Sequence, residues 1–410
     1  MNSRRCLLED LEIRTLLSSY FVSPAGSDSN AGTSSSPFLT LQMAADQVVA
    51  GDSVIVRPGT YAGFSVGWDF TQNGTASKPI RFNADAGVII NSRNVHSADG
   101  IDLEGASYII VDGFTVRNTS GTITRAGIRS VINTNCIIRN NIAEGCGTWG
   151  IFSGFSENIT IDHNTAINSI SQHGIYVSNS ADNPIVRDNV LYGNHDCGLE
   201  INADLSQGGD GIITGALVEG NIIHDNGVGG GAAINLDGVQ NSIIRNNLLY
   251  NNHAGGMSFY HIDAAAGSKN NVIANNTIIM PSDGRWDLNF TAASSGNIVF
   301  NNILFNEHPF RGSITISPDS LSGFVSDYNL IMNRFSTDDG DSIQSLAQWQ
   351  SSTKQDAHSI IATTLSAIFV NAAANDYRLS ATSAALNHGA SSFASKSAPS
   401  SDLLGAARAS

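Results

Sequence analysis

Short apolar runs that end in a polar turn recur along most of the chain. Eight of these runs close on an asparagine in phrases such as IIRNN, TIDHN and IVRDN, and successive asparagines lie 23, 25, 32, 26, 29, 26 and 27 residues apart. The asparagines are Asn141, Asn164, Asn189, Asn221, Asn247, Asn276, Asn302 and Asn329. A repeat of this length with a β-rich run in each unit predicts a solenoid, in which each coil packs only on its neighbours.

A second run follows each asparagine after a turn and usually opens with Gly and a large aliphatic residue. These runs are GIDLE (100–104), GIRSV (127–131), GIFSG (150–154), GIYVS (174–178), GLEIN (198–202), AINLD (233–237), GMSFY (256–260) and RWDLN (285–289). They alternate apolar and polar residues, as half-buried strands do. The pattern therefore predicts an all-β solenoid of roughly ten coils, each with a strand before the asparagine and a strand after the turn.

The repeated asparagine has a physical reason to recur. At a bend between two strands it can adopt the left-handed conformation, and its side-chain amide can hydrogen-bond the equivalent amide one coil away. Stacked coils would turn these bonds into an asparagine ladder.

The two ends of the chain depart from the repeat. We expect an export segment at 1–19, an N-terminal strand and capping helix within 20–60, the β-helix over 61–333, and a C-terminal cap and tail at 334–410. The helix is predicted from apolar residues at helical spacing between Leu39 and Val49, and a second short helix from SIQSLAQWQS. A capping helix covers apolar core and strand edges that an end coil would leave exposed.

The segment from Tyr20 to Tyr61 resembles the N-terminal segment of secreted right-handed parallel β-helix proteins of the pectin-lyase-like type, including family 9 polysaccharide lyases. The resemblance implies a right-handed parallel β-helix and a carbohydrate-active protein. Leu11 to Leu17 resembles the short sorting motif near the start of many exported planctomycete-type proteins, which implies a secreted or cell-surface bacterial protein. Family 9 lyases use a catalytic lysine and a calcium site of clustered aspartates, and no lysine here lies in the columns described below.

The amino-acid composition limits the classes of molecule that this protein is expected to bind. Only 14% of residues are charged, 40 are Gly, and the net charge is −15 with a pI near 4.9. This balance argues against binding nucleic acid or an anionic membrane surface, and no apolar run approaches the ~20 residues of a membrane span. The four cysteines have no zinc-ligand spacing and are expected to be free thiols. We expect a monomer that binds a polysaccharide.

Polar residues gather on the outward side of the second strands. If the aliphatics point inward, alternation places Glu200 beside Asn235, Asn202 beside Asp237, and Asp237 beside Tyr260 on neighbouring coils about 4.8 Å apart. We predict a saccharide-binding cleft there. Its predicted catalytic residues are Glu200, Asp237, His173, Tyr260 and Arg285, and its predicted substrate-binding residues are Asn202, Asn235, Tyr176, Arg129 and Asp287. Because carboxylate oxygens suit Ca²⁺, we predict a calcium site among Asp204, Asp210, Glu200 and Asp237.

Three functions fit this cluster. The first is a lyase on a uronate-containing glycan, in which Arg285, His173 or Tyr260 takes the C5 proton. The second is a glycoside hydrolase that uses Glu200 and Asp237 as its two carboxylates. The third is a non-catalytic solenoid that binds glycan at a surface. We favour the lyase, because the N-terminal segment resembles lyases.

Overall fold

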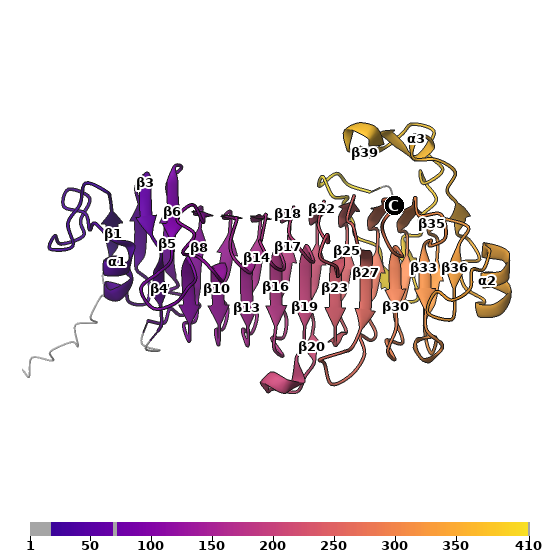
Figure 1. The fold of residues 1–410 in the computed structure, drawn as a ribbon, viewed down its shortest axis with the longest axis horizontal. Coiled ribbons are helices and arrows are strands. Elements are labelled where there is room, and N and C mark those ends of the chain that lie inside the picture. The colour runs from indigo at the N-terminus through magenta and orange to yellow at the C-terminus, as the bar shows by residue number, and fades with distance from the viewer. Residues whose placement is uncertain (1–17, 69–71, 409–410) are drawn as a thin grey trace, which may run out of the picture.

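The computed structural model describes residues 18–68 and 72–408, and it is a parallel β-solenoid built from three long sheets (Figure 1). The predicted sorting motif at Leu11–Leu17 and Cys6 lie outside the described residues. Each coil contributes one strand to each sheet, and within each long sheet neighbouring strands are parallel. The predicted all-β right-handed β-helix is confirmed. We had predicted two strands per coil, and the third strand is the short run directly after each asparagine.

The strands before the asparagines form sheet I. Its twelve strands in the described chain are β1 (Ser19–Val22), β2 (Ser53–Val56), β5 (Ile80–Ala84), β8 (Ile109–Asp112), β11 (Ile137–Arg139), β14 (Thr160–Asp162), β17 (Ile185–Arg187), β21 (Leu217–Glu219), β25 (Ile243–Arg245), β28 (Val272–Ala274), β31 (Ile298–Phe300) and β34 (Val325–Asp327).

The second strands of the sequence pattern form sheet II. Its eleven described strands are β4 (Phe64–Val66), β7 (Ile101–Glu104), β10 (Ala126–Val131), β13 (Trp149–Gly154), β16 (Ile175–Ser178), β19 (Leu199–Asn202), β23 (Ala232–Asp237), β27 (Gly255–Tyr260), β30 (Leu288–Phe290), β33 (Ile314–Ile316) and β36 (Phe335–Ser336).

The short strands after the asparagines form sheet III. Its twelve described strands are β3 (Gly59–Ala62), β6 (Val88–Ser92), β9 (Thr115–Arg117), β12 (Ile142–Glu144), β15 (Thr165–Ile167), β18 (Val190–Tyr192), β22 (Ile222–His224), β26 (Leu248–Tyr250), β29 (Thr277–Met280), β32 (Ile303–Asn306), β35 (Leu330–Ile331) and β37 (Ile360–Ile361).

The asparagine ladder lies between sheets I and III and is continuous over all eight asparagines. Asn164 shows the arrangement: its Nδ2 and backbone N donate to Oδ1 of Asn189, while its own Oδ1 accepts from Asn141. The same bonds continue to Asn329. The expectation that the ladder asparagine itself adopts the left-handed conformation was wrong. The left-handed residue is the one before each ladder asparagine, for example His163 (φ 54°) before Asn164.

Helices lie at the two ends of the solenoid. In α1 (Leu41–Gln47) the side chains of Leu41, Ala44 and Ala45 are buried in the main core. In α2 (Leu346–Thr353) the Trp349 ring is fully buried and stacks on Phe335 of the last sheet II strand. The helix predicted in SIQSLAQWQS is therefore present, and it covers the C-terminal end of the core.

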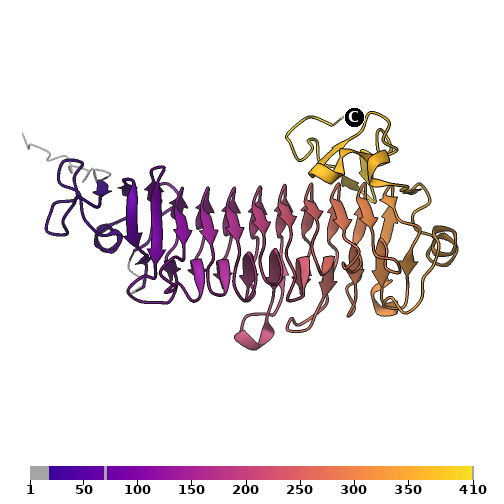
Figure 2. The ribbon, with the colours of Figure 1, turned by 45° about the horizontal axis from the view of Figure 1, so that its top comes forward.

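The rest of the C-terminal segment folds back over the last coils (Figure 2). It contains α3 (Leu365–Ile368), η3 (Ala372–Ala374) and two hairpins, β38 (Phe369–Asn371) with β39 (Asp376–Leu379) and β40 (Ser392–Phe393) with β41 (Lys396–Ser397). Asn246, in the turn after sheet I, bonds both the Ser401 carbonyl and the Arg408 guanidinium. The segment from Ser401 to Arg408 is thus held against the coil that contains β25.

Long loops leave the solenoid at the carboxyl ends of the sheet II strands. The loop after β19 holds η1 (Leu205–Gln207) and β20 (Ile213–Thr214), which pairs with β24 (Val239–Gln240) (Figure 1). A third short helix, η2 (Pro318–Ser320), follows β33. No helix of the described residues is long and apolar enough to cross a membrane.

The ladder makes a direct prediction for stability. Asn189→Ala removes the acceptor for two donors of Asn164. The backbone N of Asn164 is left buried without a partner, and its Nδ2 keeps only the bond to the Ile138 carbonyl. Because such groups cost about 1–3 kcal/mol each, we expect a loss of about 2 kcal/mol or more, read as a lower melting temperature by circular dichroism. Gln207→Ala, which removes an exposed amide in the η1 loop, is the control. Equal melting temperatures for the two variants would contradict this role of the ladder.

Candidate active site

The predicted polar columns form on the outer face of sheet II. Along this sheet the inward aliphatics are buried in the core, and the outward residues stack in register. One column runs Tyr176, Glu200, Asn235 and Ser258, and the next runs Ser178, Asn202, Asp237 and Tyr260. We refer to the outer face of sheet II from β13 to β33 as the sheet II face.

The register predicted for β30 was wrong. We predicted Asp287 as an outward, substrate-binding residue of RWDLN (285–289), but the residue that pairs with Ser258 is Asn289. Asp287 lies before the strand, fully buried, where it accepts a hydrogen bond from Asn306 Nδ2, and burial raises its pKa well above the usual range. The residue that faces solvent in the first column is therefore Asn289, and Asp287 is a buried polar group of the core edge.

Glu200 lies at the centre of the sheet II face and is only 5% exposed. Tyr260 donates its hydroxyl to Oε1 at 3.2 Å, and Cys197 donates its thiol to Oε2 at 3.1 Å. Burial raises the pKa of Glu200 to about 7, with opposing contributions from the hydrogen bonds of Cys197, Asn235 and Tyr260. A carboxyl group that titrates near neutral pH is suited to taking and giving protons.

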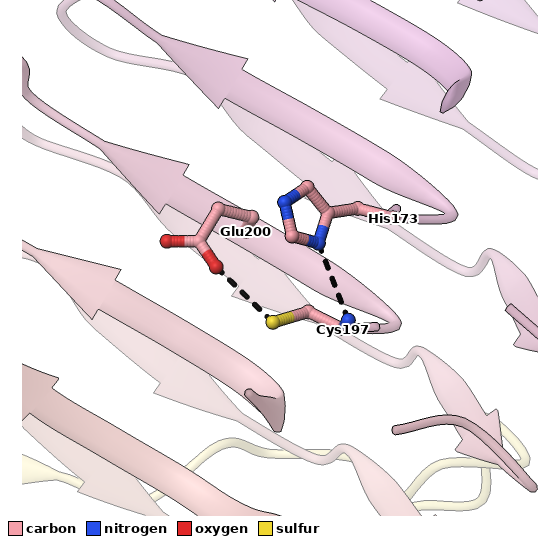
Figure 3. A group of neighbouring side chains, drawn as sticks. All are labelled: His173, Cys197 and Glu200. Carbon is pink, nitrogen blue, oxygen red and sulfur yellow. Dashed lines mark hydrogen bonds between the residues drawn. The ribbon is translucent and has the colours of Figure 1, made fainter. Parts of the chain in front are cut away.

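His173 approaches the same carboxylate from the preceding coil (Figure 3). Its Nδ1 accepts a hydrogen bond from the backbone N of Cys197 at 3.2 Å, so the ring proton belongs on Nε2. Burial lowers the pKa of His173 to about 4, which makes the ring neutral at physiological pH. Ligand atoms of His173, Cys197 and Glu200 lie within 4.8 Å of one another. The thiol of Cys197, which sequence reasoning left unassigned, thus helps to position Glu200.

Asp237 has a different environment from Glu200. It is 1% exposed and accepts hydrogen bonds from the backbone N of Ile262 and of Asp263. Asn202 in turn donates to Asp263 Oδ2. Burial raises the pKa of Asp237, and those backbone donors oppose the rise. Asp237 is therefore the carboxylate that holds the loop after β27 in place.

The predicted calcium ligands do not come together. Asp204 accepts from the backbone and hydroxyl of Ser206 at the start of η1, and Asp210 accepts from Ile212 N on the exposed loop. Among the described residues, no group of close acidic, His or Cys ligand atoms includes Asp204 or Asp210. Both oxygens of Asp237 already accept from backbone groups. The arrangement does not fit the predicted calcium site.

Two predicted arginines lie away from Glu200. Arg129, three strands before Glu200 in the same column, pairs with Asp102 at 2.9 Å and with Glu104 at 2.5 Å. These two carboxylates pair with the guanidinium charge of Arg129, so Arg129 has a structural role in ion pairs. Arg285 lies just before β30 and lines a separate cavity with Ser258 and Asn289.

An aromatic cluster precedes Glu200 on the sheet II face, and sequence reasoning missed all but one of its members. The Trp149 ring lies 4.6 Å from Phe152 and 5.9 Å from Tyr176, and the Phe152 ring lies 5.4 Å from Tyr176. All three rings are partly exposed. The signal was available in the chain, since Phe152 and Tyr176 occupy the same outward column as Glu200, two coils and one coil before it.

A larger cavity, of about 780 Å³, lies under the C-terminal segment and is lined by Ile279, Phe305, Thr364 and Tyr377 among others. Its walls combine polar and apolar side chains, Glu307 is the one charged residue among the lining residues, and none of the predicted site residues lines it. The buried carboxyl group of Glu200, which bonds the Cys197 thiol and the Tyr260 hydroxyl, lies outside this cavity.

Known proteins resemble this chain along its whole solenoid. The family model of the Pel9A-like right-handed β-helix region matches residues 20–173, and that of the right-handed β-helix region matches residues 167–322. The chain is 35% identical to the uncharacterized protein YwoF of Bacillus subtilis over 106 residues (24% of this chain, 22% of that protein). It is 40% identical to pectate lyase PEL9 of Emericella nidulans over 82 residues (20% of each). The matched segments thus span about a fifth of the length of these relatives.

Two solved structures share the fold. The crystal structure of pectate lyase Pel9A aligns with a TM-score of 0.60 and 18% identity over 94% of this chain and 95% of that one. A glycoside hydrolase aligns with a TM-score of 0.53 and 10% identity over 78% and 94%. At these identities the likeness concerns the architecture.

The raised pKa of Glu200 predicts how stability depends on pH. From pH 4.5 to about 7 the folded protein keeps a proton that the unfolded chain has released, so the free energy of unfolding falls as pH rises through this window. Glu200→Gln removes this loss, which is on the order of 3 kcal/mol. We expect the variant to melt at a higher temperature than the wild type at pH 8, with a smaller gain at pH 5. The exposed Glu307→Gln is the control, and a gain for Glu200→Gln that is equal at both pH values would contradict the shift.

Proposed function

The chain belongs to the right-handed parallel β-helix proteins of the pectin-lyase-like family, and we propose that it is an enzyme that cleaves a uronate-containing polysaccharide by elimination at Glu200. The observation that carries this proposal is the environment of Glu200: one buried carboxyl group with a pKa of about 7, on an exposed sheet face, held by two hydrogen-bond donors. The match to pectate lyase PEL9 over a fifth of the chain supports the same class of reaction.

Glu200 acts as the base in this proposal. Its ionised carboxylate takes the proton from C5 of a uronate, the electron pair forms the C4–C5 double bond, and the bond from C4 to the glycosidic oxygen breaks. Burial and the charge of Glu200 raise the pKa of Tyr260, which therefore keeps its proton at neutral pH. Since its hydroxyl bonds Glu200 Oε1, Tyr260 is placed to protonate the leaving oxygen and to be reprotonated by Glu200.

Neighbouring groups would position the sugar chain. Trp149, Phe152 and Tyr176 offer aromatic surface on one side of Glu200, where the apolar face of a sugar ring can pack. The amides of Asn202 and Asn235 line the same two columns as the reacting groups. The neutral His173 keeps Cys197 and hence Glu200 in place.

The hydrolase alternative requires a second free carboxylate near Glu200. Asp237 is the candidate, but both of its oxygens accept backbone hydrogen bonds from the loop after β27. We therefore favour elimination, which needs one base. No step of the proposed reaction uses calcium, because the predicted ligands are apart. A polysaccharide substrate agrees with the expected location outside the cell, which stays a prediction.

The pH dependence of the rate tests the role of Glu200. Since the base must be ionised, kcat/KM should rise about tenfold per pH unit below the pKa of about 7 and level off above it. Glu200→Gln should lower kcat by a factor of about 10² or more, with Glu307→Gln unchanged. The assay is the absorbance of unsaturated product from a panel of uronate polysaccharides.

The same assay distinguishes the alternatives. New reducing ends without unsaturated product would indicate hydrolysis, and glycan binding without either product would indicate a non-catalytic solenoid. Repeating the assay with a chelator tests whether the activity requires calcium. Loss of activity would show that a metal ion takes part in the reaction.

A further inference from the structure

A second polar site lies on the sheet II face, three strands beyond Glu200. It is a cavity of about 290 Å³ between β27, β30, β33 and the segment after β36. Its lining includes the guanidinium-bearing residues Arg285 and Arg311, with His308, Ser258, Asn289 and Thr315. Glu200, Asn235, Ser258, Asn289 and Thr315 follow one another in a single column, so the cavity continues the proposed cleft along the solenoid axis.

The charges of this cavity are not neutralised. Neither Arg285 nor Arg311 forms an ion pair in the described part of the chain, and the Arg311 guanidinium donates a hydrogen bond to the neutral Gly284 carbonyl at 3.4 Å. The one carboxylate in the lining is Asp339, which is exposed to solvent. In a chain with a net charge of −15, two unpaired guanidinium groups in one cavity point to an anionic ligand.

The cavity also holds hydrogen-bonding groups without partners. Thr315 is 1% exposed, lies in the outward column, and its hydroxyl has no hydrogen-bond partner. His308 Nδ1 accepts from the backbone N of Phe310 and of Arg311, which leaves its Nε2–H as a donor. Burial lowers the pKa of His308, with Arg311 and Arg334 adding to the effect, so the ring is a neutral donor.

We infer that this cavity is a carboxylate subsite, in which Arg285 and Arg311 bind the carboxylate of a uronate residue that is not the one being cleaved. The subsite lies about 14 Å from Glu200, as three strand spacings of about 4.8 Å give. It therefore contacts a sugar further along the chain. The inference rests on the proposed function for its substrate, and it specifies that substrate as a polysaccharide with acidic groups on more than one residue.

The test compares binding of acidic and neutral forms of the same oligosaccharide by calorimetry. The probes are tetrasaccharides of galacturonate, mannuronate, guluronate and glucuronate, each as the free acid and as the uncharged methyl ester. Wild-type protein should bind at least one acid about tenfold or more tightly than its ester. Arg311→Gln and Arg285→Gln should each weaken binding of the acid by about tenfold and leave the ester unchanged. Arg378→Gln, which removes an equal charge from the C-terminal hairpin, is the control.

The outcomes separate the subsite from the reaction. If the arginine variants lose affinity for the acid while no probe polysaccharide is cleaved, the subsite stands and the lyase proposal fails. If cleavage occurs but both arginine variants bind acid and ester as the wild type does, the lyase stands and the subsite is refuted. Failure of the wild type to bind any of the four acids, or an equal loss with Arg378→Gln, would also refute it.

Discussion

The in-register stacking of coils is the constraint on which the rest of the structure depends. Eight buried asparagines bond one another through Nδ2 and Oδ1, and each also accepts from, or donates to, the backbone of a neighbouring coil. A buried amide that slipped by one residue would lose several partners together, which is costly. The ladder between sheets I and III thereby fixes the register on sheet II, and with it the two columns that bring Glu200, Asn235, Asp237 and Tyr260 together.

The repeating parts of this arrangement could be predicted from the sequence. The asparagine spacing predicted the solenoid, and strand alternation predicted that Glu200 lies beside Asn235 and Asp237 beside Tyr260, as the structure has them. The predicted strand register was wrong where the repeat is broken. In RWDLN (285–289) the residue that pairs with the core residue Met257 is Leu288, so the outward position belongs to Asn289 and not to the predicted Asp287. The sheet III strands are only two to five residues long and were read as parts of turns.

The chemistry around Glu200 was harder to predict for a different reason. Cys197 lies two residues before β19 begins, where strand alternation does not predict the direction of a side chain, and its contact with Glu200 depends on the local backbone. The role of Asp237 is decided by a loop that returns after β27, and no periodic pattern describes that loop. The carboxylate subsite combines Arg285, His308 and Arg311 from two irregular segments with a column residue, Thr315. Such sites follow from tertiary structure, because their residues share no repeat position.

Different kinds of side chain lie on the two sides of Glu200 along the sheet II face, so the two ends of the proposed cleft differ. Partly exposed aromatic rings precede Glu200 and unpaired guanidinium groups follow it. A crystal structure of the Glu200→Gln variant with a bound acidic tetrasaccharide tests this account most directly. The account predicts a saccharide along the sheet II face, with one C5 hydrogen beside residue 200 and another residue's carboxylate between Arg285 and Arg311. A saccharide bound elsewhere, such as in the cavity under the C-terminal segment, would contradict it.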